Sequence, residues 1–176
     1  MATAFPEKVG TGFSSGNAEN KVVPVVRVQR EDFDLAAEVA AISDGRTDIG
    51  AVVTFSGLCR DEGETLAALE LEHYPGMAEA QIAKFAGEAI RRWPVQALTA
   101  IHRFGKVAPG ENIVLVIAAS PHREAAFAAA SFLMDYLKTS APFWKKETTP
   151  EGVRWVDARE SDSASRARWD SSGRQS

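Results

Sequence analysis

His122 and Arg123 are placed where they could bind an anion. They directly follow Ser120-Pro121, a pair typical of the first residues of a helix. Free backbone N–H groups and the helix dipole favour an anion at such a position, and an arginine fork with a histidine donor suits phosphate oxygens. Taken alone, the pair is also typical of the charged, solvated start of a helix, which is the simpler interpretation.

Lysines are concentrated further along the chain. Three of the seven, Lys138, Lys145 and Lys146, fall within nine consecutive residues. Lys138 ends a predicted helix, where a lysine is the expected partner of the helix dipole. Lys145 and Lys146 follow residues 142–144 (PFW) in a segment predicted to be non-helical. Aromatic walls can desolvate a lysine, lower its pKa and make it a proton carrier. The aromatic residues can equally be core, with both lysines extending to water.

Cys59 and Arg60 follow a predicted strand at a position common for ligand contacts. Arg60 is alternatively a surface arginine paired with a neighbouring carboxylate. Cys59 could act as a nucleophile or sulfur carrier, but the lack of a nearby base favours a small buried thiol. His73 and His102 lie on predicted strands without metal-ligand spacing, so core or hydrogen-bonding roles are expected. Phosphate-loop, dinucleotide-binding and hydrolase-elbow motifs are absent.

The composition limits the class of protein. The chain has 176 residues, 45% hydrophobic and 25% charged, which is ordinary for one soluble domain and excludes collagen-like, fully disordered and membrane-spanning chains. The net charge of −4 disfavours non-specific nucleic-acid binding. Residues 1–20 lack the apolar segment of a secretory signal, and a single cysteine excludes an internal disulfide. We therefore expect a reducing, cytoplasmic location.

The elements that must position the basic residues are predicted from hydrophobic spacing and turn residues. Strands are predicted at 22–28, 50–57, 69–73, 98–104, 113–119 and 153–156. Helices are predicted at 34–42, at 77–93 and from Ser120-Pro121 to about Thr139. Strand pairs interrupted by helices indicate a single α+β domain with a mainly antiparallel sheet.

Further details of the organisation follow from single residues and from the ends of the chain. Pro24 places the first strand at a sheet edge. The last helix is expected to bury Phe127, Ala130, Met134 and Leu137. Residues 1–20 are expected to form a disordered leader, residues 21–159 the ordered domain, and residues 160–176 a polar, mobile tail in which Trp169 is a candidate for docking.

A series of linked motifs points to a known family. The stretches are LEHYPGM (71–77), RWP (92–94), IHRFGKVAPGE (101–111), SPHREAAF (120–127), DYLKTSAPFWKKE (135–147) and TPEGVRWVDARESD (149–162). With GAVVTFSG (50–57) before Arg60, they span about residues 22–162 in order. In these motifs the chain resembles the large, catalytic subunit of molybdopterin synthase, the MoaE family. The linked series is far more specific than any one motif.

The resemblance implies a fold and a function. The fold is an α/β hammerhead with an additional antiparallel β-sheet, in a single domain. The implied enzyme is a sulfurtransferase that makes the dithiolene of molybdopterin from cyclic pyranopterin monophosphate. Sulfur comes from the C-terminal glycine thiocarboxylate of a small ubiquitin-like partner subunit, and two charged partners supply the two sulfurs. The assembly is a heterotetramer around a central homodimer of large subunits, and no cofactor or metal is expected.

The resemblance also assigns roles residue by residue. Lys138 of DYLK and Lys145 of WKKE are the expected catalytic residues, and both are expected to bind substrate. The other expected substrate-binding residues are Arg60, His122, Arg123, Lys146 and Glu147. Weaker candidates are Leu58, Cys59 and Arg159, the first two through backbone contacts. The thiol of Cys59 is then a bystander, because sulfur arrives on the partner.

Two other functions remain open from the sequence. One is a non-catalytic scaffold of the same fold that binds a ubiquitin-like sulfur carrier. The presence of Lys138, Lys145 and Arg123 argues against it. The other is a phosphate-ester enzyme working alone, which would turn over the pterin without a thiocarboxylated partner.

Overall fold

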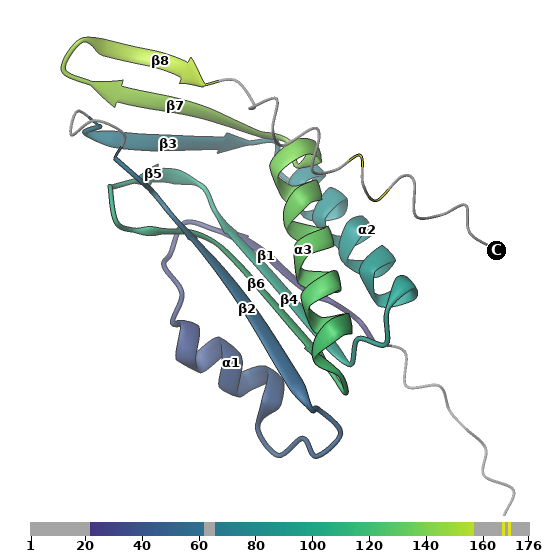
Figure 1. Ribbon diagram of the computed structural model, residues 1–176. Helices are drawn as coiled ribbons and strands as arrows, with labels where there is room; N and C mark the ends of the chain where they lie inside the picture. The colour runs from purple at the N-terminus through teal and green to yellow at the C-terminus, as the bar shows by residue number, and fades with distance from the viewer. Residues whose placement is uncertain (1–21, 62–65, 157–166, 168, 170–176) are drawn as a thin grey trace, which may run out of the picture.

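Two four-stranded sheets and three helices make up the part of the chain that the computed structural model describes, which is residues 22–61, 66–156, 167 and 169 (Figure 1). The helices are α1 (Leu35–Ser43), α2 (Met77–Arg92) and α3 (Arg123–Ser140). The strands are β1 (Val25–Gln29), β2 (Ala51–Leu58), β3 (Ala68–His73), β4 (Ala97–Arg103), β5 (Gly105–Val107), β6 (Asn112–Ser120), β7 (Phe143–Thr149) and β8 (Gly152–Val156).

The central sheet has the order β1-β4-β6-β2 and is covered by helices on both faces (Figure 1). Only β1 and β4 pair in parallel in this sheet, and the other pairs are antiparallel. On β6, Val114, Val116 and Ala118 belong to the core under α2 and α3, whereas Leu115 and Ile117 belong to the core under α1. Burial on both faces explains why β4 and β6 read as continuous apolar runs. The edge position predicted for the strand with Pro24 is confirmed.

The outer sheet has the order β5-β3-β7-β8, is antiparallel throughout, and lies beyond one end of the central sheet (Figure 1). A small core of Cys59, Leu69, Leu71 and Val107 packs beneath it. The α+β prediction with mainly antiparallel pairing is therefore confirmed, and so is the additional antiparallel sheet. The sequence places the segment 141–147 outside a helix but predicts no strand there, whereas residues 143–147 form the start of β7.

Helix α3 differs from its prediction in two respects. Ser120 belongs to β6, where its hydroxyl donates to the Pro94 carbonyl at 2.9 Å, and His122 is the N-cap residue. Phe127 is 63% exposed, so its predicted burial is wrong, although Ala130, Met134 and Leu137 are buried as predicted. Ala126, Ala129 and Ala130 are buried and let the helix lie close to the sheet. Phe127 lies on the solvent-exposed face of the helix.

The ends of the chain are described only in part. The predicted leader (1–20), both predicted domain boundaries and the predicted tail (160–176) lie outside the described residues, apart from residues 167 and 169. Trp169 packs edge-on against Trp93 and Phe132, and its Nε1 donates to Asp135 at 2.6 Å, so the docking predicted for it is confirmed. Among the described helices, none is long and apolar enough to cross a membrane.

Candidate active site

Lys138 and Lys145 line one cavity of about 310 Å³. The cavity lies between the C-terminal end of α3, the end of β2 and the start of β7. His102 is the third side chain with a polar group in its lining. Its apolar lining comes from Phe55, Leu58, Ile113, Val114, Met134, Leu137, Ala141 and Phe143. The cavity therefore combines two cationic groups with a largely hydrophobic wall.

The two lysines meet because the helix ends between them. Lys138 lies in the last turn of α3, and Ala141 is the C-cap residue. Pro142 cannot continue the helix, and the chain turns into β7 at Phe143. Alternate residues of a strand share a face, so Lys145 points to the same side of β7 as Phe143. Both lysines are exposed, so the cavity opens to solvent at its cationic side.

Lys146 lies on the opposite face of β7. Its ammonium group pairs with Glu72 of β3 and lies 4.3 Å from the centre of the Trp155 ring. Glu147 is on the same face as Lys145, and its Oε2 accepts two hydrogen bonds from Arg154, at 2.9 and 2.7 Å. Neither Lys146 nor Glu147 lines the cavity.

A bulge at the end of β2 directs Leu58 into the cavity. The pairing with β6 shifts between Gly57, opposite Val114, and Leu58, opposite Asn112. A side chain at Gly57 would come within 2.7 Å of Val114, so glycine suits this position. Arg60 follows on the exposed side of the strand end and is not part of the cavity lining.

Cys59 lies directly beyond the bulge and is almost fully buried, with 3% of its surface accessible. Burial raises the pKa of its thiol, and the nearby carboxylates Glu111, Asp61 and Glu147 act in the same direction. A protonated thiol is a poor nucleophile. The expectation of a small buried thiol is confirmed.

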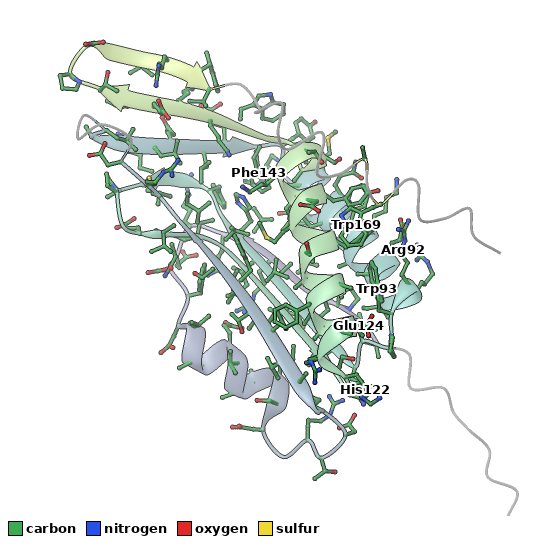
Figure 2. All side chains as sticks on the ribbon, viewed as in Figure 1. Arg92, Trp93, His122, Glu124, Phe143 and Trp169 are labelled. Atoms are coloured by element: carbon green, nitrogen blue, oxygen red, sulfur yellow. The ribbon has the colours of Figure 1, made fainter. Side chains whose placement is uncertain are left out.

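His122 and Arg123 lie at the other end of α3 from the lysines. They border a separate hollow with Gly50, Pro121 and Glu124. Lys138 lies fifteen positions after Arg123 in the helix, which is about 22 Å along the axis. Figure 2 shows His122 and Phe143 at opposite ends of the helix. One chain therefore does not bring this pair to the lysine cavity, and Arg159 lies outside the described residues.

His102 is the cavity residue that the sequence assigned only to a core or hydrogen-bonding role. Its ring stacks on Phe143 with centroids 3.8 Å apart and planes 17° apart. Its Nδ1 lies 2.8 Å from the carbonyl oxygen of Arg103. Burial lowers the pKa of His102 to about 4, and the positive charge of Lys145 acts in the same direction. In the sequence, the alternation of Leu98, Ala100 and His102 indicates that His102 shares the buried face of its strand with two apolar residues.

Other hollows and polar clusters do not add to this site. A larger hollow of about 560 Å³ lies between α1, β1 and β4, where Arg27 pairs with Glu38, and it contains none of the predicted site residues. In the part of the chain that is described, no three His, Cys, Asp or Glu side chains come together as metal ligands would.

Comparisons with a family model, with curated proteins and with solved structures agree on one family. The family model described as "MoaE protein" matches residues 28–140. A molybdopterin synthase catalytic subunit of Mesorhizobium japonicum is 65% identical over 153 residues, which cover 86% of this chain and 96% of the relative. A solved molybdopterin biosynthesis MoaE protein of Burkholderia ambifaria is 53% identical with a TM-score of 0.74, covering 84% of this chain and 99% of that one. A crystal structure of molybdopterin synthase from Staphylococcus aureus is 30% identical with a TM-score of 0.69, covering 74% and 95%.

Proposed function

Because the chain belongs to the MoaE protein family, we propose that the cavity of Lys138 and Lys145 is the active site of a molybdopterin synthase. In this role the chain is a sulfurtransferase. It transfers sulfur from the C-terminal thiocarboxylate of a small ubiquitin-like subunit to cyclic pyranopterin monophosphate and forms the dithiolene of molybdopterin. Each transfer moves one sulfur atom to the pterin and leaves the partner with a carboxylate, whose new oxygen comes from water.

The observation that carries this proposal is the convergence of two lysines from different elements on one cavity with an apolar wall. Two ammonium groups offset the negative charge of a thiocarboxylate and of oxygens that become negative as sulfur attacks. Lysine also gives and takes protons, which the ring opening requires. The hydrophobic side of the cavity, with Leu58 and Phe143, suits the extended tail and the flat pterin.

The pair His122–Arg123 enters this function through a second copy of the chain. Its position at the start of α3 suits the phosphate of the pterin. A tricyclic pterin does not span the length of α3, so the pair cannot serve the Lys138 cavity of its own chain. We propose that, in the central homodimer, the pair of one subunit completes the cavity of the other.

The remaining predicted residues have supporting positions. Arg60 at the end of β2 is proposed to contact the anionic substrate at the open side of the cavity. Glu147, held by Arg154, stabilises the strand that carries Lys145. Lys146 points away from the cavity, so its proposed contribution is to hold β7 against β3 through Glu72. Leu58 is proposed to act through the cavity wall and its backbone.

The organisation of the chain and its location are part of the same proposal. Residues 21–159 form the catalytic domain, with a leader before it and a polar tail after it. The small subunit docks on each large subunit of the homodimer. The location is the cytoplasm, which suits an enzyme with a single, buried cysteine.

Adjacent lysines on opposite faces of β7 provide a sharp test. Lys145→Ala removes a cavity ammonium group and is expected to lower kcat by about a hundredfold or more. Lys146→Ala removes a lysine one residue away and is expected to keep kcat within about threefold, because it loses a half-exposed ion pair. Conversion of the pterin by the thiocarboxylated partner is followed by mass. Equal losses in the two variants would refute the assignment of the cavity.

Lys138 is tested in the same assay with a helical lysine as control. Lys138→Ala is expected to abolish conversion and leave the small subunit bound, whereas Lys84→Ala on α2 is expected to behave as the native chain. A Lys138→Ala variant that forms product at a near-native rate would favour the scaffold alternative. Turnover of the pterin without any thiocarboxylated partner would favour the enzyme that works alone.

A further inference from the structure

His102 lines the lysine cavity, and the sulfur transfer proposed above gives it no role. It follows Leu98 and Ala100 on the face of β4 that is turned toward α2 and α3. At the end of this face the helices give way to β7, whose Phe143 stacks on the imidazole at 3.8 Å. Only 8% of the residue is accessible. The ring is therefore almost buried and still borders the cavity.

The hydrogen bonding of the ring fixes which nitrogen carries the proton. Nδ1 lies 2.8 Å from the carbonyl oxygen of Arg103, and a carbonyl oxygen only accepts. Nδ1 therefore donates, and in a neutral ring Nε2 has a lone pair and only accepts. Burial lowers the pKa of His102 to about 4, with Lys145 and His73 acting in the same direction, so the neutral ring predominates near pH 7.

Nε2 is available to a ligand. It makes no hydrogen bond within the described residues. His102 is one of the residues that line the cavity, so its ring borders the space that a ligand would occupy. The bond to Arg103 and the stack on Phe143 together set the direction in which Nε2 points.

His102 is the side chain in the cavity lining that can accept a hydrogen bond. The other two polar side chains in its lining, Lys138 and Lys145, carry ammonium groups, which only donate. They match the oxygens of a carboxylate, a thiocarboxylate or a phosphate. A ligand that also carries N–H groups and buries them against the apolar wall would leave them without a side-chain partner, which costs binding free energy.

We propose that Nε2 of His102 accepts a hydrogen bond from an N–H group of the ligand bound in the cavity, and that His102 thereby contributes to substrate specificity. This inference rests on the proposed function, since it concerns the same cavity. Two participants in that function carry N–H groups. One is the backbone of the partner's C-terminal tail, and the other is the pterin with its ring and amino nitrogens.

Three substitutions separate the acceptor from the other features of the ring. His102→Asn keeps an amide that can donate to the Arg103 carbonyl but has no atom at the position of Nε2. His102→Gln places an amide oxygen near that position. His102→Phe keeps the stack on Phe143 and has no acceptor. The control is His73→Phe, because His73 also stacks on Phe143, at 6.0 Å, and does not line the cavity.

The experiment measures two dissociation constants by calorimetry with the full chain. One titration uses cyclic pyranopterin monophosphate, and the other uses the small subunit with its native C-terminus. His102→Asn and His102→Phe are expected to weaken one of the two by about tenfold, the usual effect of losing a buried hydrogen bond. His102→Gln is expected to recover most of this loss, and His73→Phe to lose nothing. The constant that changes identifies the donor as pterin or tail.

A second measurement does not depend on affinity. Nitrogen-15 NMR of the ring is expected to show Nδ1 protonated and Nε2 bare in the free protein, and the Nε2 signal is expected to move when the ligand binds. Native binding of both ligands by His102→Asn and His102→Phe, or an unmoved Nε2 signal in the complex, would overturn the inference alone. Failure of the native chain to bind either ligand would instead refute the proposed function, and this inference with it.

Discussion

The distance between the two ends of α3 leads to a prediction about mixed dimers. Arg123 and Lys138 are about 22 Å apart along the helix, and we propose above that each active site takes its lysines from one subunit and its arginine from the other. Arg123→Ala and Lys138→Ala each damage both sites of a uniform dimer. A hybrid dimer with one subunit of each kind collects both lesions in one site and leaves the other site intact. Its activity is expected to be about half that of the native dimer, since a two-fold dimer has two equivalent sites.

The assay uses co-expression of the two variants with different affinity tags and purification on both. The hybrid is mixed with the thiocarboxylated small subunit and the pterin phosphate, and product is measured by mass. A hybrid of Lys138→Ala with Lys145→Ala is the matched control, because both lesions fall in the lysine cavity and no site is intact. If the first hybrid were no more active than its two parent variants, the completion of the site by a second copy would be refuted.

Three further predictions concern single positions. Cys59→Ser is expected to keep kcat within about twofold, because the buried, protonated thiol is not expected to take part in sulfur transfer. A folded but inactive variant would instead indicate a persulfide mechanism. Gly50→Ala would place a Cβ 2.2 Å from the Pro121 carbonyl oxygen beside His122, so it is expected to lower the free energy of unfolding, measured in urea, by about 1–3 kcal/mol. The control Gly87→Ala on α2 is expected to raise this free energy by about 0.5–1 kcal/mol. The reverse order of the two variants would contradict this packing. His102 is neutral in the folded state down to a pKa of about 4, but it gains a proton on unfolding below its ordinary pKa of 6.5. As pH falls between these two values, the free energy of unfolding of the native chain is therefore expected to decrease by about 1.4 kcal/mol per pH unit more than that of His102→Phe. Parallel curves of unfolding free energy against pH for the two chains would refute the buried neutral ring.

The sequence was sufficient for the helix end that lies between the two lysines, but it did not predict β7, the strand that carries Lys145. The spacing of apolar residues, the lysine at the helix end and Pro142 defined a helix that stops between Lys138 and Lys145. Pro24 likewise marked an edge strand, because proline cannot donate to the sheet ladder. These features are local, and local residue chemistry decides them.

Features that depend on the packing of distant segments were not predictable. Lys145 and Lys146 lie on opposite faces because their segment pairs with β3 as a strand, and that pairing is not visible in the charged segment itself. Phe127 has the spacing of a core residue, but neighbouring alanines take the buried face. His102 lies at a cavity only because β4 of the central sheet and β7 of the outer sheet come together there. The separation of Arg123 from Lys138 matters for function only in the proposed assembly of two chains.

We propose that this chain transfers sulfur in a cavity that contains Lys138 and Lys145. The most direct test is to mix the purified chain with its thiocarboxylated small subunit and cyclic pyranopterin monophosphate and to follow the pterin by mass. With the native chain we expect a product that has gained two sulfur atoms, and with Lys138→Ala we expect no such product although the small subunit still binds. Formation of the same product at a native rate by Lys138→Ala, or its absence with the native chain, would contradict sulfur transfer in this cavity.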